Sequence, residues 1–278
     1  MIRFDDPARP ARLARSAAAL LLLGAVVACG DMDRAADADP ETDVAPADRT
    51  TAQLLVSPET HVAPAARLEI VSPGDGHRFA EGDSIPVQFN LGGFELRAPT
   101  PSGDERGLAR APDGQHIHLI VNDGAYRAIY DIDQPIMVGG LSAGTHAIRA
   151  FPGRDWHESV KTPEAFAQIL VVVGDAELDT YIGPVVVYSR PQGVYEGPDA
   201  DSILVDFYVD NIELGDDAYQ ILFTLNGGQT FRITEWQPYL LVGLEAGEHT
   251  LRMELFDPLG EPVETPYLPV ERTFEIRR

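Results

Sequence analysis

Short runs of alternating apolar and polar residues recur along the chain from residue 66 to the end, and Gly, Pro, Asn and Asp separate them. Alternation of this kind places successive side chains on opposite faces of a β-strand. The pattern therefore predicts an all-β protein. The expected strands cover 68–71, 85–91, 116–121, 126–130, 146–151 and 166–173, followed by 185–188, 203–209, 219–225, 230–233, 249–256 and 272–276.

The pattern occurs twice. Leu141–Arg149 (LSAGTHAIR) returns as Leu244–Arg252 (LEAGEHTLR). An offset of roughly 100 residues is that of a whole domain and not of a short repeat. Six or seven short strands in this length predict two tandem immunoglobulin-like β-sandwiches, at 66–174 and 181–278. A feature found in only one copy is then a candidate for function.

Residues 1–28 have the features of an export signal, because four arginines precede an apolar run from Ala17 to Ala28. That run is too short to span a bilayer. It ends in the letters VVAC, and Cys29 is the only cysteine of the chain. Here the chain resembles bacterial lipoproteins, and the resemblance implies cleavage before Cys29 and acylation of that residue. The implied location is the bacterial cell envelope, with a membrane bound through the lipid anchor. A cleaved signal peptide followed by a chance cysteine is the alternative.

Residues 29–65 are rich in Ala, Asp, Pro and Thr and poor in large apolar side chains. Such a segment cannot bury enough surface to offset the entropy of ordering. We therefore expect the lipidated Cys29 to be followed by a flexible, disordered stalk.

The charge is strongly negative, with 21 basic and 44 acidic residues and a formal net charge of −23. Nucleic-acid binding depends on Lys and Arg, so this composition argues against a nucleic-acid partner. Lys161 is the only lysine. An acidic surface with almost no lysine is typical of proteins that work in high salt. A genome that encodes Arg in place of Lys would give the same composition.

The first copy contains an insertion. Val87 matches Val205 at an offset of 118, whereas Asn122 matches Asn226 at an offset of 104, which leaves 14 extra residues in the first copy. They lie in the loop 97–112. Loops on a rigid sandwich often bind ligands, although an insertion can also be a tolerated expansion.

Two histidines follow that loop on one predicted strand. The match between the copies directs Ile117 and Leu119 to the core, so His116 and His118 project from the opposite face, about 7 Å apart. Imidazoles at this spacing can share a metal ion.

Zinc or copper needs at least one further ligand. His157 and Glu158 follow a later strand and have no counterpart in the second copy. If the strand order brings the segments together, His116, His118, His157 and Glu158 form a mixed nitrogen and oxygen site. The alternative is a half-exposed sheet face on which the histidines pack without a metal.

The same segment is the best candidate for binding an organic ligand or a protein. An exposed Trp156 flanked by Arg154, Asp155 and Glu158 suits stacking on a sugar ring, and His157 belongs to the same candidate site. In the alternative, Trp156 plugs the end of the sandwich. The HIHL run at His116, followed by LSAGTH, is similar to uncharacterised exported bacterial domains of immunoglobulin-like shape, and this resemblance implies no established activity.

Two further sequence features are expected to have a structural role and not a catalytic or binding one. His146 and His249 follow the same glycine in both copies, so we expect each imidazole to lie at the rim of its core and bond a loop. The letters GDSI ending at Ile85 resemble the nucleophile block of GDS-type esterases, but that block belongs to an α/β fold.

Acidic residues could hold calcium between or beside the sandwiches, although isolated acidic pairs are usually solvated. They are Asp175, Glu177, Asp179, Asp199 and Asp201. The sequence predicts a non-enzymatic binding or scaffold module without a resident cofactor. Metal binding and glycan binding are the alternatives.

Overall fold

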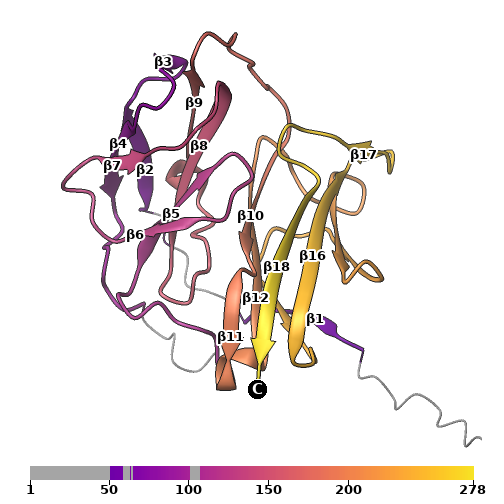
Figure 1. Ribbon diagram of the computed structural model, residues 1–278. Coiled ribbons are helices and arrows are strands. Elements are labelled where there is room, and N and C mark those ends of the chain that lie inside the picture. Colours follow the sequence, from indigo (N-terminus) through magenta and orange to yellow (C-terminus); the bar gives the residue numbers. More distant parts are fainter. Residues whose placement is uncertain (1–50, 59–62, 64, 101–106) are drawn as a thin grey trace, which may run out of the picture. The chain divides into compact units, whose positions relative to one another are not determined.

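The computed structural model describes residues 51–58, 63, 65–100 and 107–278 (Figure 1). The described chain consists of β-strands and two 3-10 turns, η2 (Pro163–Ala165) and η3 (Gly197–Ala200). In these residues no helix has the length and apolar character needed to cross a bilayer. The signal segment, Cys29 and most of the predicted stalk lie outside the described residues.

The first sandwich has two sheets. The smaller has the order β2-β4-β7, and the larger has the order β3-β9-β8-β5-β6, with β3 parallel to β9. Strand bounds in the smaller sheet are β2 (Arg67–Ser72), β4 (Ile85–Gly92) and β7 (Ile136–Val138). Those in the larger sheet are β3 (His77–Phe79), β9 (Ala167–Val173), β8 (Gly144–Gly153), β5 (His116–Val121) and β6 (Arg127–Ile129).

The second sandwich repeats this arrangement. One sheet has the order β1-β15-β12-β10, and the other has the order β11-β18-β16-β13-β14, with β11 parallel to β18 and β17 paired to β16. The first of these sheets contains β1 (Gln53–Val56), β15 (Tyr239–Val242), β12 (Ser202–Asp210) and β10 (Val185–Arg190). The second contains β11 (Gly193–Glu196), β18 (Val270–Arg277), β16 (Gly247–Phe256), β13 (Gln220–Leu225), β14 (Gln229–Ile233) and β17 (Pro262–Val263).

The strand orders of the two sandwiches correspond one for one when β1 and β17 are set aside. The predicted fold class, two tandem immunoglobulin-like sandwiches, is confirmed by this shared topology. Each predicted run is a strand, within a few residues at its ends. The sequence missed only short strands, such as β3, β7 and β11, because three or four residues are too few to show an alternation.

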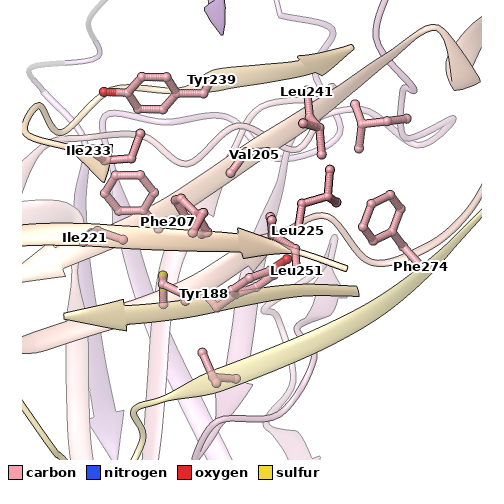
Figure 2. Close-up of a cluster of buried hydrophobic side chains, with 14 of the residues drawn as sticks. Tyr188, Val205, Phe207, Ile221, Leu225, Ile233, Tyr239, Leu241, Leu251 and Phe274 are labelled. Carbon is pink, nitrogen blue, oxygen red and sulfur yellow. The ribbon is translucent and has the colours of Figure 1, made fainter. Parts of the chain in front are cut away.

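Each sandwich has its own core. In the second, Leu251, Met253 and Leu255 alternate along β16 and are buried between the sheets, together with Phe207 and Phe223. Figure 2 shows Leu251 near Leu225 and Tyr188 in this core. One face of β16 therefore belongs to this core.

The stalk predicted over residues 29–65 is wrong at Gln53–Val56. These residues form β1, which pairs antiparallel with β15 from Gln53↔Val242 to Val56↔Tyr239, and Figure 1 shows β1 beside the strands of the second sandwich. A short apolar run, QLLV, finds an open sheet edge, which a composition argument cannot detect. The chain thus contributes a strand to the second sandwich before it builds the first.

The two sandwiches share a buried interface. Ile120, Tyr126 and Phe151 of the first pack against Val187 and Tyr208 of the second in one hydrophobic cluster. This cluster covers the face of β5 and β8 that points away from the first core. The half-exposed sheet face considered from the sequence is therefore wrong, because the second sandwich covers it.

Candidate functional site

His116 and His118 project from β5 toward this interface, as the alternation predicted. Ile117 and Leu119 belong to the core of the first sandwich, so the intervening histidines lie on the other face. Both histidines are fully buried, with 0% of each exposed. Burial of adjacent imidazoles is costly unless their nitrogens find partners, so those partners identify the site.

His157 reaches the same place from the loop after β8. Its backbone lies in the left-handed region, with φ at 70°. Its amide donates to the Arg154 carbonyl at 2.8 Å, and the Arg154 amide donates to the Glu158 carbonyl at 2.8 Å. A non-glycine residue in this region costs about 1–2 kcal/mol. Such outliers concentrate at ligand-binding positions, and here the strained backbone directs the imidazole to His116.

Three ring nitrogens converge. His116 Nε2 lies 3.0 Å from His118 Nε2 and 3.2 Å from His157 Nδ1. All three nitrogens lie within 4.8 Å of one another. We call this set the histidine cluster. Among the described residues it is the only group of three or more His, Cys, Asp or Glu side chains arranged to hold a metal ion.

Burial keeps the cluster uncharged. Desolvation is the largest cause that lowers the pKa of His116 and holds the pKa of His118 well below its usual value. Desolvation, together with the nearby positive charge of Arg190, lowers the pKa of His157 to about 2. Neutral imidazole is the form that ligates metals. The three side chains are therefore in the ligating state at neutral pH.

The outer nitrogens of two rings are anchored. The Gly114 carbonyl can only accept, so His116 Nδ1 donates to it, at 2.9 Å, and Nε2 presents its lone pair to the cluster. His118 Nδ1 lies 3.1 Å from the Ser189 hydroxyl, on β10 of the second sandwich. A hydrogen bond on the outer nitrogen orients most metal-bound histidines. Both sandwiches thus help to position the cluster.

Gly153 makes room for the cluster. It pairs with His116 across β5 and β8, and a Cβ atom at this position would lie 2.4 Å from His118 Nε2. In the second sandwich the equivalent pair is Gln220 and Phe256, and His118 corresponds to Leu222. The second copy has a phenylalanine and a leucine at the strand positions of Gly153 and His118, so the site belongs to the first copy alone.

Glu158 does not join the cluster, contrary to the predicted mixed site. Its Oε2 accepts the indole N–H of Trp156 at 2.7 Å. The expected oxygen ligand is therefore wrong, because Glu158 alternates with His157 along the loop and points away from it.

The exposed Trp156 predicted for sugar stacking is also wrong. Trp156 is 1% exposed and packs with Leu108 and Leu204. Arg154 and Glu158 are buried as well. Leu108 belongs to the insertion and Leu204 to β12 of the second sandwich, so the indole is buried between the sandwiches and does not fill the end of the first, where the alternative placed it.

The described part of the insertion 97–112 packs on this same loop. The Thr100 amide donates to the Asp155 carboxylate at 3.1 Å, and Arg110 forms an ion pair with that carboxylate. The two segments found only in the first copy thus support one another beside the histidine cluster. Residues 101–106 of the insertion lie outside the described residues.

Sequence reasoning missed Tyr126, Ser189 and Arg190. The Tyr126 hydroxyl lies 2.9 Å from His157 Nδ1 and accepts from Arg190 Nη2. Tyr126 stood in a predicted strand, but the other two residues lie on β10 of the second sandwich. Only the packing of one sandwich on the other brings them to the site.

The other nominated positions are structural. His146 Nε2 donates to the Ser142 carbonyl at 2.8 Å, and His249 Nε2 donates to the Glu245 carbonyl at 2.9 Å, which confirms the predicted loop bonds. The candidate calcium ligands do not gather into one group within the described chain. One of them, Asp201, pairs with Arg278 at 2.7 Å.

Fold and site together define an all-β protein of two immunoglobulin-like sandwiches with a buried histidine cluster at their interface. No family model matches the chain, and no curated protein matches it.

The solved structures that match this chain include the following three. The fibronectin(III)-like modules of Clostridium thermocellum CbhA are 13% identical over 76% of this chain and 94% of theirs, with a TM-score of 0.26. A two-domain fibronectin type III segment of chicken tenascin is 14% identical over 76% of this chain and 99% of its own, with a TM-score of 0.22. The Bacteroides ovatus protein SGBP-B, in complex with a mixed-linkage heptasaccharide, is 15% identical over 76% of this chain and 47% of its own, with a TM-score of 0.21. The fold class follows from the strand order itself.

Proposed function

We propose that the chain is a non-enzymatic binding module of the bacterial cell envelope that holds one zinc or copper ion in its histidine cluster. The observation that carries this proposal is the convergence of three neutral imidazole nitrogens from two separate segments of the first sandwich, two of them on the buried His116 and His118 and one on the half-buried His157. Imidazole suits zinc and copper among the first-row metals.

The distances fit a common ion. Two nitrogens bound at about 2.05 Å lie about 2.9 Å apart at a right angle and about 3.3 Å apart at the tetrahedral angle. His116 Nε2 lies 3.0 Å from His118 Nε2 and 3.2 Å from His157 Nδ1, and both distances fall in this interval. The third distance, between His118 Nε2 and His157 Nδ1, is within 4.8 Å. We expect it to shorten when an ion is bound.

The test is calorimetric titration of the full chain, purified without a histidine tag, with zinc and with copper. We expect one ion per chain. The matched variant is His116→Gln with His118→Leu, which installs the residues that occupy the same strand positions in the second sandwich, Gln220 and Leu222. This double variant should lose at least a hundredfold in affinity.

The control is His249→Asn, because His249 bonds a loop of the second sandwich and not the cluster. It should bind as the unaltered chain does. Equal uptake by the unaltered chain and by the double variant would contradict metal binding in the cluster. The scaffold function would then remain, with the buried interface fixing the two sandwiches as one body.

The location in the envelope is part of the proposal and rests on the sequence at Cys29 alone. Mass spectrometry of the mature protein should show acyl groups on an N-terminal Cys29. A Cys29→Ser variant should leave the membrane fraction. An unmodified Cys29 would contradict the proposed lipid anchor but would not affect the proposal of a metal site.

A further inference from the structure

A cavity of about 240 Å³ lies between the two sandwiches, and none of the residues that line it belongs to the histidine cluster. One wall is formed by residues 158–162, after β8, and the other by residues 236–238, before β15. Val56 and Pro58, at the end of β1, are exposed and also line the cavity, so it opens to solvent. Cavities for drug-sized ligands enclose about 300–1,000 Å³. This cavity therefore suits a smaller molecule, such as one ring with its substituents.

Trp236 supplies an apolar surface to the cavity. Its Nε1 donates to the Phe207 carbonyl at 3.2 Å, and its ring meets the ring of Tyr208 at an angle of 76°, with centroids 4.8 Å apart. These contacts hold the half-buried indole in place and use its only N–H group. The indole therefore offers a ligand carbon surface alone, in a position that is fixed before a ligand arrives.

Two polar groups of the cavity have hydrogen-bonding capacity left. Lys161 Nζ donates to Ser159 Oγ at 2.8 Å and to Asp206 Oδ1 at 2.5 Å. An ammonium group has three donors, so one N–H remains. Gln237 Nε2 donates to Glu235 Oε2 at 2.7 Å, while Gln237 Oε1 accepts no hydrogen bond from the described residues. The cavity thus offers a ligand at least one donor and one acceptor.

The formal charges around the cavity balance. Arg154 and Lys161 are the cations that line it, Glu158 is an anion that lines it, and Asp206 pairs with Lys161. Neither a cation nor an anion gains a net attraction here, and the net charge of −23 repels anions from the chain as a whole. A carboxylate can only accept hydrogen bonds and an ammonium can only donate them, whereas a hydroxyl does both. A neutral ligand with hydroxyl groups therefore matches the cavity.

We propose that this cavity binds one neutral sugar unit. A pyranose ring combines an apolar face of C–H groups with hydroxyls that both donate and accept. The apolar face contacts Trp236, one hydroxyl accepts from Lys161 Nζ, and another donates to Gln237 Oε1. The segment that the sequence nominated for sugar binding does border the cavity, through Arg154 and Glu158, but the indole comes from the second sandwich and is not that of Trp156. The site requires no metal ion.

The experiment is saturation-transfer NMR of the full chain, in the presence of a chelator, with millimolar methyl glycosides of glucose, galactose, mannose and N-acetylglucosamine. We expect at least one of the four to bind. Glucuronate and glucosamine, which add a charge to the glucose ring, should bind more weakly than methyl glucoside.

Trp236→Leu should weaken binding of the sugar by about tenfold, because it removes the aromatic contact. The matched control is Phe231→Leu, since Phe231 is a half-buried aromatic residue that packs on the core of the same sandwich and does not line the cavity. This control should bind as the unaltered chain does.

A second variant leaves the packing of the indole intact. Gln237→Leu is similar in size but lacks the acceptor, and it should weaken binding with little change in melting temperature. The proposal would be overturned if none of the four glycosides binds, if Trp236→Leu and Gln237→Leu both bind as Phe231→Leu does, or if phenol binds in place of every glycoside.

Zinc titration of the same variants keeps the two sites apart. Loss of sugar binding with unchanged zinc uptake in Trp236→Leu is the expected result. Loss of zinc uptake in the His116→Gln, His118→Leu variant, with sugar binding retained, would also support two separate sites. A chain that takes up no zinc but binds a glycoside would contradict the metal site alone.

Discussion

Gly153 is a single residue on which the geometry of the cluster depends. Replacement by Ala places a methyl group 2.4 Å from Nε2 and 2.7 Å from Cδ2 of His118, where the packed ring cannot move aside without losing Ser189. Overpacking of this kind costs about 1–3 kcal/mol. We expect Gly153→Ala to lower the free energy of unfolding by this amount in urea titrations and to weaken zinc binding.

Gly92→Ala is the control for that substitution, since no atom lies within 4 Å of the added methyl group. A Gly153→Ala variant as stable as Gly92→Ala, with unchanged zinc affinity, would mean that His118 is not confined as described.

A substitution of His157 should abolish metal binding while leaving the stability of the metal-free chain almost unchanged. Its left-handed backbone is one that Asn tolerates better than most residues. In His157→Asn we expect the relief of backbone strain to offset the lost ring contacts. The free energy of unfolding without metal should change by less than about 1 kcal/mol. The rise in melting temperature that zinc gives the unaltered chain should disappear, because one ligand is gone.

Thermal melts with and without zinc, compared with melts in a chelator, measure this directly. A His157→Asn variant that zinc still stabilises fully would remove His157 from the ligand set.

Between elements, one of the contacts that join the sandwiches is ionic. Asp206 on β12 is 0% exposed and accepts from Lys161 Nζ at 2.5 Å and from the Ser159 amide at 3.1 Å. Removing one partner of a buried pair costs about 3–5 kcal/mol, because the other charge is left uncompensated. We expect Lys161→Met to destabilise the chain by this amount.

Adding Asp206→Asn to Lys161→Met should recover part of that loss, since the amide oxygen still accepts from Ser159 and no buried charge remains. Removing the exposed Arg277–Glu275 pair is the control and should leave the stability nearly unchanged, because solvent screens an exposed pair. A double variant less stable than Lys161→Met alone, in urea titrations, would show that the Asp206 charge has another partner.

The elements themselves could be predicted where they are long. The β5 alternation alone places Ile117 in the core and His118 opposite, and the structure agrees. The loop that carries His157 could be nominated only as a difference between the copies. Whether it folds back on β5 depends on the turn at Arg154, for which the sequence has no clear signal. Glu158 was wrongly predicted as a ligand for the same reason. A shift of one residue in the loop decides whether His157 or Glu158 faces the histidine cluster.

At the scale of the molecule, the sequence predicted two sandwiches but not that they share a face. Ile120 and Phe151 occupy the outer positions of their strands and are apolar, which is a signal that this face is covered. It does not say by what, and the partner residues lie in the other copy. Ser189 meets His118, and Arg190 meets Tyr126, through this interface, so the roles of these two residues could not be read from either copy alone.

The charge of the whole chain gives the last prediction. A formal net charge of −23 destabilises the compact state through self-repulsion. Salt screens this repulsion, with a Debye length of about 10 Å at 0.1 M and about 3 Å at 1 M. If the acidic, lysine-poor surface is an adaptation to high salt, the melting temperature of the full chain should rise steadily from low salt to molar potassium chloride. The Lys161–Asp206 pair is buried and little screened, so Lys161→Met should show the same slope at a lower melting temperature. A melting temperature that stays flat or falls with added salt would favour the other interpretation, in which Arg replaces Lys for reasons of coding alone.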